Sequence, residues 1–218
     1  MSSQSATEPG LFQRIWQKIR YRLLIQEILA RLAGIGIRIQ PYYLVLEGLF
    51  GGSNPEWESD FGEFSIGFLS SPDMKHVAAL SGRPVSEDML LLWLKDGRKC
   101  FAVQYQGQVI GYTWCDFKEC NFVGHRFPLR ENEAYLFDAY TSRSFRGRNI
   151  APYMRYQCYK ELAKMGRVRL YSITALFNTS SVKFKQKLHA KPLKLGLFVE
   201  LFKRWHFNVP LREYKNEN

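Results

Sequence analysis

The chain has 218 residues, 46% of them hydrophobic and 15% aromatic, and it carries a formal net charge of +11. This length supports one sizeable hydrophobic core, so we expect one domain with an extension. No uncharged apolar run reaches about 18 residues, which argues against a membrane-spanning helix. The first ten residues are polar, so the sequence predicts no secretory signal.

Cysteine and histidine usage argues against disulfides and a metal site. The cysteines Cys100, Cys115, Cys120 and Cys158 form no C-x-x-C pair, so we expect reduced thiols in a cytoplasmic protein. The histidines at positions 76, 125, 189 and 206 lack metal-ligand spacing, and we expect no metal cofactor.

The basic charge is unevenly distributed along the chain. Residues 1–40 hold 6 Lys or Arg against 2 Asp or Glu, residues 41–142 hold 8 against 14, and residues 143–218 hold 17 against 4. The basic C-terminal part favours a phosphate-bearing ligand, an acidic protein partner or an anionic membrane. Nucleic acid is the least favoured partner, because the sequence has no zinc-finger or RNP-like motif.

In chain order, the first predicted element is a basic amphipathic helix over Leu11–Ala33, ended by Gly34 and Gly36. Trp16 lies on its apolar side. This helix either packs on the body of the protein or lies in a membrane interface. A short β-like run and a linker rich in Gly, Asn, Pro and Glu follow. We therefore expect a boundary near residue 60, with an extension over 1–60 and a domain over 61–218.

The domain has a regular succession of predicted elements. A strand at 63–71 precedes two short helices at 72–82 and 86–97, a hairpin at 100–117 and a strand at 133–141. A helix at 151–165, a strand at 169–176, a helix at 178–190 and strands at 191–202 and 205–211 complete the chain. The order β-α-α-β-β-β-α-β-α-β-β predicts a mixed α/β sheet.

One turn in this succession suits an anion. Arg146-Gly147-Arg148-Asn149 lies between the strand at 133–141 and the next helix. A helix N-terminus offers unpaired N–H groups and the positive end of the helix dipole. A glycine lets the backbone approach a ligand closely, and two arginines add charge. The turn therefore predicts an anion site that fits a pyrophosphate.

The element order and this turn resemble the GCN5-related N-acetyltransferase (GNAT) family over about residues 62–210. That family's signature, Arg/Gln-x-x-Gly-x-Gly/Ala, cradles the pyrophosphate of acyl-CoA. Here Arg146-Gly147-Arg148-Asn149-Ile150-Ala151 matches at Arg146 and Ala151 and departs at Asn149. Asn is the residue best able to replace Gly at positive φ. The resemblance implies a mixed, mostly antiparallel central sheet flanked by helices, and the amphipathic helix at Leu11–Ala33 is an N-terminal extension to it.

The resemblance also assigns candidate roles on the helix after the turn helix. It implies that Asn178 contacts the pantetheine arm of the cofactor, although a plain helix cap explains an Asn there equally. Lys185 stands where the family often has a tyrosine that protonates the leaving thiolate. A lysine can donate that proton, or it can be a solvated residue of a basic helix. His189-Ala190 replaces the Gly-Phe with which this helix often ends in the family.

Asp138 is the candidate general base. It is the only charged residue in the interior of an apolar strand, and acyl transfer to an amine requires that a proton be lost. An Asp held there by structural hydrogen bonds is the alternative, and Glu133 and His125 are weaker candidates. The resemblance implies that a backbone N–H near Tyr140 or Thr141 polarises the thioester carbonyl.

Together these residues predict an acyltransferase that moves an acetyl or other acyl group from acyl-CoA to a primary amine by direct attack in a ternary complex. One alternative is a long-chain N-acyltransferase that takes its acyl group from an acidic acyl carrier protein. Another is a non-catalytic acyl-CoA-binding module. The acceptor is expected to be a small-molecule or lipid-linked amine. Tyr112, Trp114, Phe198 and Trp205 suggest an aromatic-lined pocket for it, with the alternative that these residues belong to the core. We expect a cytoplasmic location, with peripheral binding to the inner face of the membrane as a further hypothesis.

Overall fold

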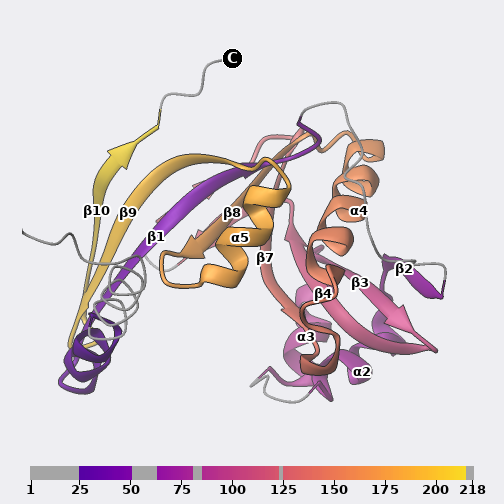
Figure 1. Cartoon of the computed structure of the whole chain (residues 1–218), viewed down its shortest axis with the longest axis horizontal. Helices are drawn as coiled ribbons and strands as arrows, with labels where there is room; N and C mark the ends of the chain where they lie inside the picture. Colours follow the sequence, from indigo (N-terminus) through magenta and orange to yellow (C-terminus); the bar gives the residue numbers. More distant parts are fainter. Residues whose placement is uncertain (1–24, 51–62, 81–84, 123–124, 215–218) are drawn as a thin grey trace, which may run out of the picture.

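The computed structural model describes residues 25–50, 63–80, 85–122 and 125–214. Its main feature is an eight-stranded sheet in the order β10-β9-β1-β8-β7-β4-β3-β2 (Figure 1). The strands are β1 (Ile37–Glu47), β2 (Phe64–Phe68), β3 (Lys99–Tyr105), β4 (Gln108–Asp116), β7 (Glu133–Thr141), β8 (Arg169–Ala175), β9 (Lys191–Leu201) and β10 (Trp205–Glu213). All neighbours are antiparallel except β7 and β8. The mixed, mostly antiparallel sheet is confirmed.

Helices cover both faces of this sheet (Figure 1). The helices α4 (Ile150–Lys164) and α5 (Thr179–Lys187) lie on one face, where Leu136, Met154 and Leu162 share a buried cluster. The short helices α2 (Met74–Ala78) and α3 (Glu87–Lys95) pack on the other face around Tyr112 and Trp114. A two-stranded sheet of β5 (Glu119–Phe122) and β6 (His125–Pro128) stands beside them. The sequence prediction missed this pair because its residues mix polar and apolar types without a clear period.

The N-terminal part of the sheet corrects the expected domain boundary. β1 lies between β9 and β8 and pairs with both, so the sheet begins at Ile37 and not after residue 60. The boundary was placed near residue 60 because the linker there is rich in Gly, Asn, Pro and Glu. The strand before this linker, β1, nevertheless pairs with strands near the end of the chain. Residues 25–34 are helical, which confirms the end of the predicted Leu11–Ala33 helix, and its beginning lies outside the described residues. In the described part of the chain, no helix is long and apolar enough to cross a membrane.

The parallel strands β7 and β8 separate toward their C-terminal ends. Their register runs from Glu133 opposite Arg169 to Leu136 opposite Ser172. Beyond that point β7 pairs with β4 on its outer side, and β8 pairs with β1 on its outer side. The chain leaves both strands at this edge and enters α4 and α5. The site-bearing turn, the start of α5 and the last residues of both strands therefore share one edge of the sheet.

Candidate active site

Asp138 lies in a β-bulge in the last part of β7. Tyr112 of β4 is opposite Tyr140, and Trp114 is opposite Phe137, so two residues of β7 face the single residue Thr113. Asp138 takes a φ of +47°, in the left-handed region that few non-glycine residues adopt. Bulges of this kind re-aim side chains next to functional sites. The single acidic residue within the apolar strand therefore lies where the backbone of β7 changes direction.

The Asp138 carboxylate faces the side of the sheet covered by α2 and α3. The Tyr112 hydroxyl donates to its Oδ2 over 3.4 Å, and the Tyr112 ring stacks on Tyr140 at 5.9 Å between centroids. Asp138 is half-buried, so it stays within reach of a molecule entering between the separating strands. A carboxylate in that position can accept a proton from an attacking amine.

The weaker candidate bases lie elsewhere. Glu133 is at the N-terminal end of β7, where its carboxylate accepts from the Arg130 N–H and the Tyr171 hydroxyl. His125 belongs to β6 and lies against the rings of Tyr42 and Phe127. Burial, followed by the charge of Lys194, lowers the pKa of His125. Glu133 thus lies at the end of β7 opposite to the separation from β8, whereas His125 lies beside Tyr42, which pairs with Ala175 at the C-terminal end of β8.

The predicted anion turn connects β7 to α4 through a short 3-10 segment, Arg143–Phe145. Asn149 takes φ +58° and ψ 13° at the N-cap of α4, which confirms that Asn adopts the left-handed conformation that the family's glycine provides. Gly147 has a φ of +80°, and nothing lies within 4 Å of where its Cβ would be. The turn therefore keeps an open glycine and a left-handed residue directly before the amides of Ile150 and Ala151.

Three cations surround this turn. Arg146 donates from Nε to the Thr141 carbonyl over 3.0 Å, and its guanidinium lies 5.8 Å from the Tyr140 ring centroid. Arg148 lies 5.6 Å from the centroid of the Phe145 ring. Lys187, at the end of α5, donates to Asn149 Oδ1 over 2.9 Å. Sequence reasoning missed Lys187, because only the packing of α5 against α4 brings it to the turn.

Asn178 is a helix cap in the structure. Its Oδ1 accepts from the Ser181 N–H over 3.2 Å and from the Ser180 hydroxyl over 2.9 Å at the start of α5. This interaction satisfies the first turn of the helix and uses the side-chain oxygen. The exposed side chain also has an amide nitrogen, which can donate to a ligand at the same edge.

Lys185 is buried, contrary to the alternative of a solvated lysine. Its Nζ donates to Ser172 Oγ over 2.6 Å and to Thr174 Oγ1, and it lies 3.4 Å from Glu47 Oε1. Burial lowers the pKa of Lys185 to about 8, and the nearby carboxylate of Glu47 only partly opposes that effect. Thr174 belongs to the part of β8 that has separated from β7. The Lys185 ammonium is therefore linked to the edge where β7 and β8 separate through the Thr174 hydroxyl, and it does not reach that edge itself.

Glu47 is the centre of a buried charge cluster with Arg155 and Lys185. Arg155 Nε lies 3.1 Å from Glu47 Oε2, and Tyr159 and Ser172 donate their hydroxyls to the same carboxylate. Burial alone would raise the pKa of Glu47, but the charges of Arg155 and Lys185 and the two hydroxyls lower it to about 2. The cluster joins β1, β8, α4 and α5 directly behind the paired part of β7 and β8. Sequence reasoning missed it because Glu47 was assigned to the extension.

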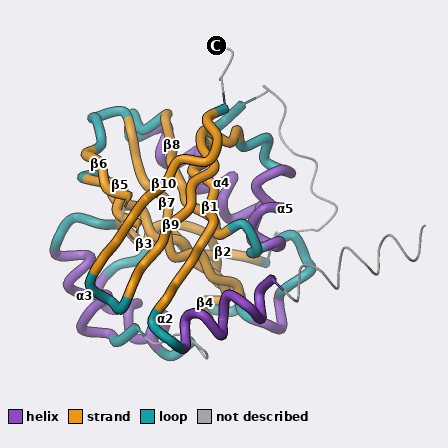
Figure 2. The backbone as a smooth tube through the Cα atoms, turned by 90° about the vertical axis from the view of Figure 1, so that its left-hand side faces the viewer, coloured by secondary structure: helices purple, strands orange, loops and turns teal. Residues whose placement is uncertain are grey.

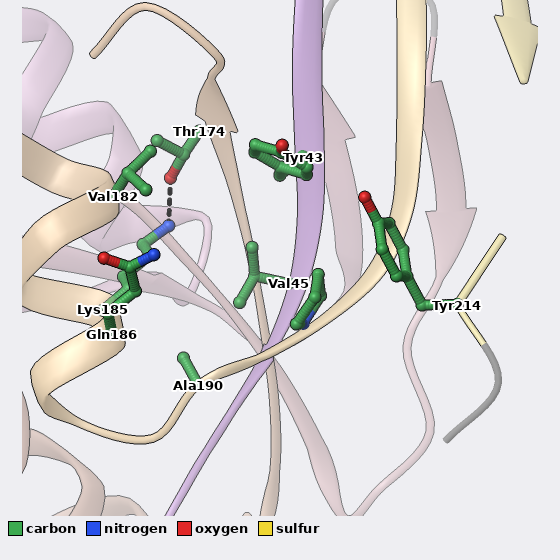
Figure 3. Close-up of a pocket in the computed structure, with 9 residues that line it drawn as sticks. Tyr43, Val45, Thr174, Val182, Lys185, Gln186, Ala190 and Tyr214 are labelled. Carbon is green, nitrogen blue, oxygen red and sulfur yellow. Dashed lines mark hydrogen bonds between the residues drawn. The ribbon is translucent and has the colours of Figure 1, made fainter. Parts of the chain in front are cut away.

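A pocket of about 170 Å³ lies beside this cluster, between α5 and strands β1, β8 and β9. Figure 3 shows Lys185 reaching from α5 toward Thr174, with Tyr43 and Val45 of β1 across the pocket. The other lining residues are Val182, Gln186, Ala190, Pro192 and Tyr214. The pocket is mainly apolar, with the buried ammonium at its wall.

The expected aromatic acceptor pocket is wrong. Tyr112 and Trp114 are buried under α2 and α3, and Phe198 is fully buried in β9. Trp205 lies on β10, the outermost strand, and is half-exposed. Strands β7, β8 and β1 separate the first two residues from the last two. These four residues were grouped because they are aromatic, but their strands are too far apart in the sheet to line one pocket.

Comparison with known proteins decides the family. Residues 68–190, more than half of the chain, match the family model described as acetyltransferase (GNAT) family. The chain belongs to the GNAT acetyltransferase family. A search of curated proteins finds no significant match to the sequence. The matched family is one of acetyltransferases.

Solved structures of GNAT proteins share this fold. A GCN5-related N-acetyltransferase from Sphaerobacter thermophilus aligns with a TM-score of 0.54 and 13% identity over 88% of this chain and 58% of that chain. A GNAT-family acetyltransferase from Colwellia psychrerythraea aligns with a TM-score of 0.54 and 13% identity over 76% of this chain and 57% of that chain. The chain thus spans less than two thirds of the length of either structure, and at such low identity the likeness shows the fold alone.

Proposed function

We propose that this protein transfers an acyl group from acyl-CoA to a primary amine by direct attack of the amine within a ternary complex. The observation that carries the proposal is the edge where β7 and β8 separate. The Asp138 bulge lies in the last part of β7, and the Arg146–Ala151 turn follows the same strand and leads into α4. A donor held on the turn would lead its thioester between the two strands toward Asp138.

The residues of the turn fit the pyrophosphate of CoA. The first amides of α4 have no partner within the helix and point out of its N-terminus. Gly147 leaves room for close approach, and Asn149 keeps the left-handed conformation that orients these amides. Arg146, Arg148 and Lys187 add positive charge on three sides. We assign the phosphates to residues 146–151 and the pantetheine arm to the Asn178 amide.

The proposed step is a single acyl transfer. The amine nitrogen attacks the thioester carbonyl carbon, a bond to nitrogen forms, and the carbon–sulfur bond breaks. Asp138 accepts the proton that the nitrogen loses, and the backbone N–H of Tyr140 or Thr141 donates to the carbonyl oxygen. The thiolate takes a proton from Lys185, passed through the Thr174 hydroxyl, so the products are an amide and the CoA thiol.

The donor is tested by offering acyl groups on different carriers. Native mass spectrometry after incubation with a mixture of acyl-CoAs should show one retained donor, and a panel of primary amines should then show release of the free thiol. An acyl carrier protein is the second candidate donor, favoured by the 17 Lys or Arg against 4 Asp or Glu in residues 143–218. Turnover with an acylated carrier protein but not with the same acyl-CoA would select that alternative.

A non-catalytic role is the remaining alternative, favoured by the departures from the family pattern at Asn149, Lys185 and His189. Such a module would retain an acyl-CoA in the same experiment but release no thiol with any amine. The acceptor is proposed to be a small-molecule or lipid-linked amine, and the location cytoplasmic with peripheral membrane binding.

A further inference from the structure

One face of the β1-β9-β10 end of the sheet has three successive rows that are entirely apolar. Each of these cross-strand rows takes one residue from each strand. Residues opposite one another in neighbouring strands share a face of the sheet. The rows are Ile37-Leu201-Trp205, Ile39-Val199-Phe207 and Pro41-Leu197-Val209.

This face is not buried within the described residues. Trp205 is 50% exposed, Phe207 51% and Val209 45%, and the residues of β1 and β9 in these rows are only partly covered. On the opposite face, polar side chains bond to one another. The Tyr42 hydroxyl, for example, donates to Asn208 Oδ1 over 2.6 Å. β10 is the outermost strand and lies on the opposite side of the molecule from α4 (Figure 1), the side that faces the viewer in Figure 2. An apolar face this large usually marks an interaction site.

The hairpin between β9 and β10 adds aromatic and basic residues at one corner. Phe202 has a φ of +52° and Lys203 a φ of +57°, and Phe202 is 62% exposed. A bulky residue at positive φ is strained, and such strain gathers at functional positions. The Arg204 guanidinium lies 5.4 Å from the centroid of the Trp205 ring. The hairpin thus presents the run Phe202-Lys203-Arg204-Trp205 to solvent.

The helical residues 25–34 meet the same corner. The Phe202 N–H donates to the Gly36 carbonyl over 2.6 Å, which fixes the hairpin against the turn that leads into β1. Beside that turn Ile35 is 64% exposed, and on the helix Ile28 is 56% exposed. Two chain segments far apart in the sequence therefore expose apolar side chains side by side. We name this surface, the three rows together with Ile28, Ile35 and the hairpin run, the β10 corner.

We propose that the β10 corner binds an anionic lipid bilayer. Exposed aromatic and aliphatic side chains next to Lys203 and Arg204 are what an interfacial site needs, because the apolar groups enter the headgroup boundary and the cations meet anionic headgroups. Upstream of the helical residues the sequence adds Arg or Lys at positions 14, 18, 20 and 22. The inference is independent of the proposed acyl transfer.

A second copy of the chain fits this surface less well. Pro210 and the register shift of β10 between Pro210 and Arg212 hinder the pairing of a second copy along the free edge of the sheet, though not its packing on the face. The net charge of +11 also opposes the approach of an identical chain. An anionic surface complements the same charge.

Vesicle co-sedimentation of the full chain tests the proposal. Phe202→Asn with Trp205→Thr removes two aromatic rings while keeping residues suited to positive φ and to a strand. Met89→Ser with Leu92→Ser is the matched control, because these exposed residues of α3 lie elsewhere. With vesicles of equal phosphatidylglycerol and phosphatidylcholine at low salt, we expect the wild type and the control to sediment alike. The hairpin variant should partition at least tenfold less, and binding should fall at high salt and without phosphatidylglycerol.

Three results would overturn the proposal. The wild type remaining in the supernatant at low salt would exclude lipid as the occupant. Equal sedimentation of the hairpin variant would place lipid binding outside the β10 corner. A dimer in light scattering that the hairpin variant loses, without vesicle binding, would assign the surface to a second copy. Unchanged melting temperatures show that the variants are folded, and acyl-CoA affinity measured without vesicles keeps this outcome separate from that of the proposed activity.

Discussion

Arg155 of α4 donates from Nη1 to the Thr113 hydroxyl over 2.7 Å, and Thr113 is the single residue opposite the Asp138 bulge. Thr113 in turn donates to the Phe137 carbonyl over 3.3 Å, next to the bulge. Because Arg155 also pairs with Glu47, a continuous chain of side-chain contacts links the buried charge cluster to the bulge. The Asp138 bulge is thus connected to the face of the sheet that α4 covers.

Asp138→Asn should lower turnover about 10²–10⁴-fold, because a positioned general base contributes that much to the rate. Asn tolerates positive φ as Asp does, so the bulge should persist and the melting temperature should stay within a few degrees. Steady-state kinetics with the donor and amine identified by mass spectrometry measure the effect, and calorimetry should show unchanged acyl-CoA affinity. A folded variant with full turnover would assign the proton to a water chain or another group.

Arg146→Ala together with Arg148→Ala should weaken acyl-CoA binding at least tenfold. Each substitution removes a charge-assisted hydrogen bond to phosphate, worth about 1.5–3 kcal/mol. Lys164→Ala is a suitable control, because Lys164 is an exposed cation at the far end of the same helix. Titration calorimetry compares the three proteins. Equal acyl-CoA affinities of the three proteins would show that the phosphates do not bind at this turn.

Substitutions at Asn149 should separate backbone shape from side-chain chemistry. Asn149→Gly keeps the left-handed conformation and should bind acyl-CoA within about threefold of the wild type. Asn149→Val should bind more weakly and lose about 1–2 kcal/mol of stability, because a β-branched residue is strained at a φ of +58°. Melting curves and calorimetry test both variants. If Asn149→Gly binds as poorly as Asn149→Val, the side-chain amide and its bond to Lys187 are what matters.

Sequence reasoning was most successful where the required property is local. The turn at 146–151 and Asn149 were predictable, because a positive φ and a helix N-terminus depend on a few adjacent residues. Apart from β5 and β6, the elements after residue 63 also followed their local periodicity. Glu47 was not predictable, because its partner Ser172 is 125 residues away and β1 lies beyond a linker. The burial of Lys185 was missed for the same reason, since it depends on Glu47.

Glu47→Gln should be among the most destabilising single substitutions in the chain, by about 3–5 kcal/mol, because it leaves Arg155 and Lys185 buried without their counter-ion. Lys185→Met should cost much less, because Glu47 keeps Arg155 and a buried ammonium is removed. Urea denaturation at neutral pH measures both. Similar losses for the two variants would mean that Lys185, and not Arg155, is the main partner of Glu47.

The same cluster predicts how stability varies with pH. The pKa of Glu47 is about 2 in the folded protein against 4.5 for an ordinary Glu, so its stabilising contribution is complete above pH 4.5 and is lost as the pH falls toward 2. The pKa of Lys185 is about 8 against 10.5, so through this group the unfolded chain binds more protons between these values and the contribution of Lys185 to stability rises with pH there. The buried thiols of Cys100, Cys120 and Cys158, whose pKa values burial raises, lower stability over the same range. Lys185→Met should therefore lose stability more steeply than the wild type between pH 8 and 10.5 while leaving the acid limb in place. A wild-type curve that falls steadily over that alkaline range, and falls equally in Lys185→Met, would contradict a buried ammonium with a lowered pKa.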